Sequence, residues 1–173
     1  VNPKGFDGLR KRLVGTQVID AVSPADEAAF LGELDSLFAL VADVDAVYTS
    51  AEVLARLKTL GRAAGGAEYV LSEITGKREF TWNGVPFIDP GAHWNGDKII
   101  KHDSTDGSDM YAVKFAASDG DEGILGITNG GLQAYEVGEL QEKPAYRARV
   151  EFYAGLVAQG GHAAARLRGI QLT

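Results

Sequence analysis

Residues 145–157 read AYRARVEFYAGLV, and their side chains alternate between two chemical kinds. One set is polar or amphipathic: Arg147, Arg149, Glu151 and Tyr153. The other set is apolar: Ala148, Val150, Phe152 and Ala154. Because successive side chains of a β-strand point to opposite faces, this period of two predicts a long strand. A strand of this length is typical either of the spine of a sheet or of one arm of a hairpin, and Gly160-Gly161 ends it.

The residues before this strand show the same period in shorter segments. We predict strands over residues 69–71, 79–82, 85–88, 98–100, 110–116, 123–128 and 132–137. Short motifs typical of tight turns stand between them: Asn83-Gly84, Asn95-Gly96, Asp106-Gly107, Asp119-Gly120 and Asn129-Gly130-Gly131. The chain has 22 glycines, nearly twice the usual share of about 7%, and we interpret this excess mainly as a sign of tight turns. After the long strand, residues 162–167 predict a last helical turn.

The first third of the chain carries helical signals instead. Residues 6–19 predict a helical turn that leads into a strand. Ser23-Pro24-Ala25-Asp26 reads as a capping box, and apolar residues then recur at intervals of three and four, which predicts a helix over 24–42. Residues 44–48 predict a short strand, and a second capping box, Thr49-Ser50-Ala51-Glu52, predicts a helix that ends near Gly65-Gly66. Early helices followed by strands indicate an α+β fold.

Composition excludes several classes of protein. A chain of 173 residues can bury a core of its own as a single domain. The absence of cysteine excludes disulfides, thiolate metal sites and thiol catalysis. A formal charge of −7 argues against a protein that grips nucleic-acid phosphates. No apolar run approaches the length of about 20 residues that crosses a bilayer as a helix.

The segment from Asp89 to Asp109 is the best candidate for a metal site. It contains His93 and His102 with five aspartates: Asp89, Asp97, Asp103, Asp106 and Asp109. Their spacing matches no ligand template, and residues 103–109 share only composition with a calcium-binding loop. We interpret this segment, and the acidic residues 118–122, as solvated polar loops. No metal, cofactor or cofactor-binding residue is predicted.

Catalytic patterns are equally weak. Ser104 or Ser108 could be combined with His102 and Asp103 as a triad, but neighbours in sequence rarely meet in that geometry. Residues 61–66, GRAAGG, lack the Lys-Ser/Thr ending of a phosphate loop. The basic residues 10–12 are better interpreted as a solvated face than as a phosphate patch. No catalytic residue is therefore predicted, and the chain is not expected to be an enzyme.

Two tryptophans, Trp82 and Trp94, flank a pair of expected strands. They could stack on a ligand, but a role as buried anchors is the better interpretation.

Several segments together resemble the major capsid proteins of tailed bacteriophages, whose Hong Kong 97-like fold encapsulins share. They are residues 6–19 (FDGLRKRLVGTQVI) with the capped helix and strand that follow, 110–115 (MYAVKF), 126–132 (GITNGGL), 137–144 (VGELQEKP), 147–156 (RARVEFYAGL) and 163–170 (AAARLRGI). Each segment is short, and the resemblance is specific only in their combination.

The resemblance implies an architecture of two lobes. A peripheral lobe, residues 1–47 and 138–173, would be built on a long spine helix over 24–42 and on long strands, including 145–157. An axial lobe, residues 48–137, would hold a central sheet flanked by helices.

The implied function is structural. The chain would self-associate into hexamers and pentamers of an icosahedral shell around a viral genome. Scaffold, portal and maturation protease are possible further partners, whereas specific nucleic-acid recognition and membrane binding are not expected. The protein would be located in the virion, and in the host cytoplasm during assembly.

Two alternatives stay open: the shell of an encapsulin-like compartment, and a small metal- or ligand-binding module that uses Asp89–Asp109. Members of the capsid family also carry an N-terminal arm and an extended loop that clasp neighbouring subunits, and they are usually longer than this chain. We therefore expect the chain to be the core of a capsid protein, and this core alone to be a monomer or a weak oligomer.

Overall fold

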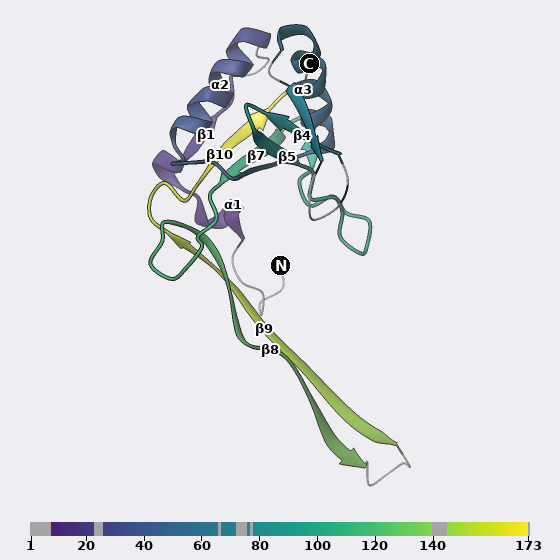
Figure 1. Ribbon diagram of the computed structural model, residues 1–173. Coiled ribbons are helices and arrows are strands. Elements are labelled where there is room, and N and C mark those ends of the chain that lie inside the picture. Colours follow the sequence, from purple (N-terminus) through teal and green to yellow (C-terminus); the bar gives the residue numbers. More distant parts are fainter. Residues whose placement is uncertain are drawn as a thin grey trace.

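The structure is a computed structural model that describes residues 8–22, 26–65, 67–71, 76, 78–139 and 145–172. Figure 1 shows a body of helices and sheet from which a long two-stranded hairpin extends. This mixture of helices and strands confirms the expected α+β class. No helix in the described ranges combines the length and the apolar character needed to span a membrane.

The body is organised around one mixed sheet. Its strands follow the order β1-β10-β7-β2-β5-β4-β3, with the short β6 beside β7. In chain order they are β1 (Val18–Asp20), β2 (Ala46–Thr49), β3 (Ala67–Leu71), β4 (Arg78–Trp82), β5 (Val85–Ile88), β6 (His102–Asp103), β7 (Gly107–Val113) and β10 (Ala164–Ile170). The last strand lies inside the sheet, parallel to β1 and antiparallel to β7.

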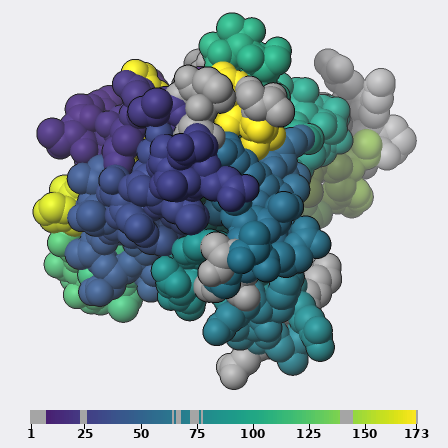
Figure 2. Space-filling view, turned by 90° about the horizontal axis from the view of Figure 1, so that it is seen from above, coloured from purple at the N-terminus to yellow at the C-terminus, as the bar shows by residue number. Residues whose placement is uncertain are grey.

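Two helices cover one face of this sheet, α2 (Glu27–Ala39) and α3 (Ala51–Ala64). Figure 2 looks down on the body from above, and the blue atoms of this part of the chain cover much of that view. Buried side chains of both helices meet those of the strands in the larger core: Phe30, Leu34, Leu37, Val53, Leu57, Val47, Phe80, Met110 and Leu167. The three-and-four spacing of the apolar residues therefore identified the buried helix faces correctly.

The two helix starts can be compared with the predicted capping boxes. Ser50 caps α3, since its hydroxyl oxygen accepts a hydrogen bond from the Val53 amide at 3.4 Å. Helix α2 begins at Glu27 rather than at residue 24, because the Asp26 carboxylate accepts a hydrogen bond from the Ala29 amide at 2.7 Å and fills the cap position. Ser23, Pro24 and Ala25 lie outside the described residues.

The opposite face of the sheet is covered by smaller elements. The single-turn α1 (Leu9–Arg12) and the 3-10 turn η1 (Gly15–Gln17) lead into β1, as the sequence predicted for this segment. Leu13, which follows α1, packs with Ile100 and with Tyr111 and Val113 of β7 in a second core. Ile124, at the base of the hairpin, belongs to the same core.

Two local predictions were wrong. Residues 162–167 do not form a helical turn, because residues 164–170 are strand β10, in which Ala164, Ala165 and Leu167 are fully buried. Pairing on both edges outweighs the helix preference of alanine there. Residues 98–100 do not form a strand either, since only an isolated bridge joins Ala92 and Lys98.

The hairpin consists of β8 (Gly123–Glu139) and β9 (Tyr146–Gln159), which pair with each other along their length. The long strand predicted from residues 145–157 is thus one arm of a hairpin. The two strands predicted over 123–128 and 132–137 are one strand, β8, in which the expected turn at Asn129-Gly130-Gly131 is a bulge.

The organisation of the body differs from the lobe boundaries expected from the resemblance. Strands β1 and β10, from the expected peripheral segments 1–47 and 138–173, lie in the same sheet as β2 and β7. Helix α2, from the expected peripheral segment, likewise shares one core with α3, from the expected axial segment. The hairpin of β8 and β9 extends away from the body in Figure 1.

Candidate interaction surface

The hairpin is the most exposed element of the chain. Its 14-residue strand β9 extends about 45 Å at roughly 3.3 Å per residue. Among the described residues, the base of the hairpin is fixed to the body, where Ile124 and Leu156 pack into the second core. The Ile124 amide also donates to the Lys114 carbonyl at 2.7 Å. An isolated two-stranded hairpin is at best marginally stable in water, so most of this arm lacks the packing that usually supports a sheet.

One face of the hairpin is apolar, and we call it the even face because it carries the even-numbered residues of β9. Leu132 lies opposite Phe152, and Ala134 lies opposite Val150, so these four side chains share that face. Their large members are exposed: Leu132 by 71%, Val150 by 63% and Phe152 by 58%. Tyr146, further out on the same face, is 74% exposed. This confirms the alternation seen in the sequence and shows that its apolar side faces solvent.

The other face, which we call the odd face, is mostly polar over the outer part of the arm. Gln133 lies opposite Glu151, and Tyr135 lies opposite Arg149. Arg149 and Glu151 form an ion pair along β9. The odd face carries Arg147, Arg149 and Glu151, whereas the even face carries Glu136 opposite Ala148, so the two faces differ in what they can contact.

The pairing of β8 with β9 is irregular at two places, between Thr128 and Leu132 and between Glu136 and Gly138, and the first of these preserves the division of faces. Three residues, 129–131, stand opposite Tyr153 alone, and the pairing then resumes at Leu132 with Phe152. Gly130 and Gly131 have φ values of 73° and 72°, a left-handed conformation that favours glycine. A bulge that adds two residues keeps the face of the side chains beyond it, because the strand period is two.

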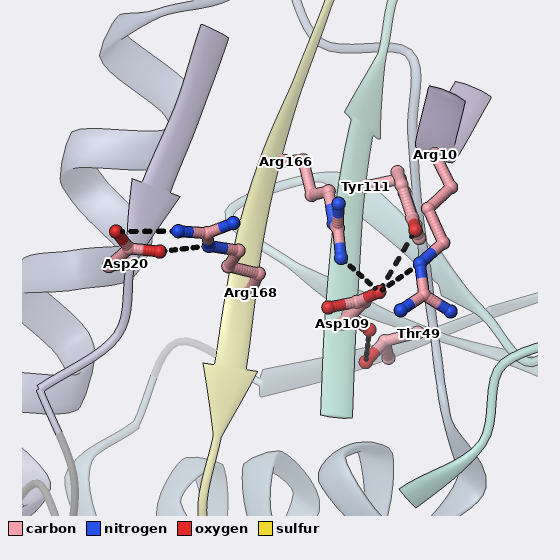
Figure 3. A network of polar contacts seen from close by, with 7 residues as sticks. All are labelled: Arg10, Asp20, Thr49, Asp109, Tyr111, Arg166 and Arg168. Atoms are coloured by element: carbon pink, nitrogen blue, oxygen red, sulfur yellow. Dashed lines mark hydrogen bonds and ion pairs between the residues drawn. The ribbon is translucent and has the colours of Figure 1, made fainter. Parts of the chain in front are cut away.

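A polar network lies on the body, on the sheet face opposite α2 and α3. Figure 3 shows side chains from three elements directed at Asp109 of β7. Its Oδ2 atom lies 2.8 Å from Arg166 Nη2, accepts from the Tyr111 hydroxyl at 3.1 Å, and lies 4.0 Å from Arg10 Nε. Burial, followed by the Asp109 charge, raises the pKa of Tyr111 well above its usual range.

A neighbouring ion pair joins β1 to β10. Arg168 binds both carboxylate oxygens of Asp20, with Nη2 to Oδ2 at 3.0 Å. The hydrogen bond from Arg168 lowers the pKa of Asp20. Both networks border a depression of about 1010 Å³. Its lining contains four basic and four acidic residues, so the charges balance: Arg10, Lys101, Arg166 and Arg168, and Asp20, Asp103, Asp106 and Asp109. The Asp20 and Asp109 carboxylates therefore link β1, β10, β7 and α1.

The acidic candidates in 89–109 are not gathered around one point. Asp109 belongs to the network just described, and the Asp97 carboxylate accepts from the Asn95 side chain. Asp103 accepts from the Thr105 and Asp106 amides, which lowers its pKa, and so closes a local turn. Across the described residues, no group of three or more His, Asp or Glu side chains is arranged to hold a metal ion.

The residues that could be written as a triad, a combination the sequence did not favour, make other contacts in the structure. The Ser108 hydroxyl hydrogen-bonds the Ser50 hydroxyl at 2.8 Å in a buried position, rather than His102. In the other acidic loop, the Asp121 carboxylate accepts from the Ser118 amide and hydroxyl. Residues 61–64 of the GRAAGG segment are the last turn of α3.

The two tryptophans behave differently. Trp82 is buried in the larger core, as expected. Trp94 is 99% exposed, so its predicted role as a buried anchor is wrong. It sits in a tight turn, where the Gly96 amide donates to the His93 carbonyl at 2.9 Å.

The Asp109 network was missed in the sequence because Arg166 was placed in a helical turn over residues 162–167. The alternation Ala165-Arg166-Leu167-Arg168 is a period-two signal that could have indicated β10.

Comparison of the chain with protein-family models and with curated proteins gave no match.

Proposed function

We propose that this chain is the core of a phage major capsid (head) subunit with a Hong Kong 97-like fold. Its function is to self-associate into the capsomers of an icosahedral shell that encloses the viral genome. The observation that carries the proposal is the hairpin, which extends an exposed apolar face away from a well-packed body. Contiguous exposed apolar patches on folded proteins usually mark interaction surfaces.

The contrast between body and arm supports a structural role. The body has two hydrophobic cores and a sheet whose inner strands are paired on both edges. It can therefore hold the base of the arm rigidly while the arm reaches a neighbouring molecule. The resemblance in residues 126–132 and 147–156 falls on this arm, which joins the sequence argument to the geometry.

The metal-binding alternative receives less support from the contacts. The Asp103 and Asp97 carboxylates already accept hydrogen bonds within their own turns. Binding of a cation would have to compete with these bonds. The compartment alternative would use the same hairpin, so the contents of assembled particles distinguish it from a phage head: nucleic acid in one case and protein cargo in the other.

The proposal is tested by sedimentation velocity over a concentration series of this chain, together with electron microscopy of the product of the complete reading frame. We expect reversible association of the chain and closed particles from the complete product. A chain that stays monomeric at every concentration, with a complete product that forms no particles, would contradict the proposal.

A further inference from the structure

We propose that two copies of this chain pair through the even faces of their hairpins, packed face to face about a twofold axis. This inference rests on the proposed function and makes it specific, because it names the contacting surface, the partner and the symmetry. The partner is a second copy of the chain, and the same residues contribute from both sides.

The size of the even face fits such a pair. Tyr146 and Phe152 are 74% and 58% exposed, and aromatic side chains contribute about 150–250 Å² each when buried. Leu132 and Val150, 71% and 63% exposed, bring the exposed area to on the order of 500 Å² per copy. Two copies would bury on the order of 1,000 Å², the lower limit for a specific interface. We therefore expect a weak, concentration-dependent dimer.

The inner part of the face is compatible with itself. From Phe152 and Leu132 to Val150 and Ala134 the even face carries no charged group. Glu136, opposite Ala148, lies on the same face next to this patch, so the two copies meet through the inner patch and the Glu136 carboxylate stays at its rim. The Arg149–Glu151 ion pair lies on the odd face and would stay in water. Two sheets packed in this way lie about 10 Å apart, and the alanines leave room for the larger side chains of the second copy.

The middle of the even face lies near the proposed axis, which gives a direct test. The chain has no cysteine, so single cysteines can be introduced as Val150→Cys on the even face and Glu151→Cys on the odd face. These neighbours on one strand form a matched pair. Because the two sheets would lie about 10 Å apart, the probe is a bismaleimide linker of about that span, since a disulfide needs a shorter Cα separation of about 4.4–6.8 Å.

We expect the V150C chain to give at least about tenfold more cross-linked dimer than the E151C chain, because residue 150 would lie at the interface and residue 151 would face water. Circular dichroism and sedimentation velocity on both variants confirm that each is folded and report its association. If both variants cross-link equally, or if neither does while the chain still associates, the face-to-face pairing is wrong but the proposed function survives. If neither cross-links and the chain is monomeric throughout, the pairing and self-association of this chain fail together.

A second pair of variants guards against an effect of cysteine on folding. Phe152→Asp places a charge in the proposed interface, and Tyr153→Asp places it on the opposite face of the same strand. We expect the dimer dissociation constant to rise at least about tenfold for F152D and less than about threefold for Y153D, because burial of an unpaired charge is costly. Equal effects of the two variants would overturn the pairing.

Discussion

Asp109 is the residue whose replacement tests most sharply how β7, β10 and α1 are held together. Its Oδ2 atom is the common partner of Arg166, Tyr111 and Arg10. The Asp109→Ala change leaves the largely buried Arg166 guanidinium and the Tyr111 hydroxyl without their acceptor. The Arg166 Nε atom is already buried without a hydrogen-bond partner, so the guanidinium has little to replace the lost carboxylate.

The size of the effect follows from burial. Removing one partner of a fully buried ion pair destabilises a protein by about 3–5 kcal/mol. The Arg166 and Asp109 side chains are 11% and 17% exposed, and water therefore compensates part of the loss. We expect Asp109→Ala to lower the free energy of unfolding by about 3 kcal/mol.

Urea denaturation followed by circular dichroism measures this change as a shift in midpoint at a constant m-value. Asp35→Ala, at an exposed position of α2, is the control and should stay within about 0.5 kcal/mol of the parent chain. The double change Asp109→Leu with Arg166→Met should recover at least about 1 kcal/mol relative to D109A, because apolar side chains can replace a buried ion pair. An Asp109→Ala chain as stable as the control would refute the role assigned to this network.

Three further predictions concern the body. The lowered pKa of Asp20 contributes stability above its ordinary pKa of about 3.9, and this stability is lost as the pH falls through the lowered value. Asp20→Asn should therefore flatten the acid side of a plot of unfolding free energy against pH, and an unchanged acid side would refute the pairing with Arg168. The raised pKa of Tyr111 contributes stability that is lost as the pH rises above about 10, so Tyr111→Phe should weaken that alkaline loss, which the same profile would show. Gly107 and Gly15 both have a left-handed φ, 72° and 64°, but a Cβ on Gly107 would meet backbone atoms of β10 at 2.6 Å, whereas one on Gly15 meets nothing within 4 Å. Gly107→Ala should therefore cost at least about 2 kcal/mol more than Gly15→Ala in urea melts.

Elements with local signals could be predicted from the sequence. The helix after Ser50 begins where its cap predicts, because a hydroxyl and an amide three residues apart decide the start. The long strand β9 follows from alternation within a single segment. Its partner β8 was recognised in two parts, since the bulge at 129–131 contains residues that are also typical of turns.

Elements that depend on distant residues could not be predicted in the same way. Strand β10 is a strand because it pairs with β1 and β7, and its contact from Arg168 to Asp20 spans 148 residues. Three consecutive alanines favour a helix locally, and only these pairings reverse that preference. The exposure of Trp94 was missed for a related reason, because burial depends on what packs against a turn and not on the residue type alone.

The most direct test of the central claim is negative-stain electron microscopy of the complete reading-frame product, with and without Phe152→Asp in the hairpin. The proposed function predicts closed particles of uniform size from the parent, and the even-face contact predicts their loss in the F152D variant. A parent product that forms no particles would contradict the shell function. Particles that form equally well in both chains would contradict the role given to the apolar face of the hairpin.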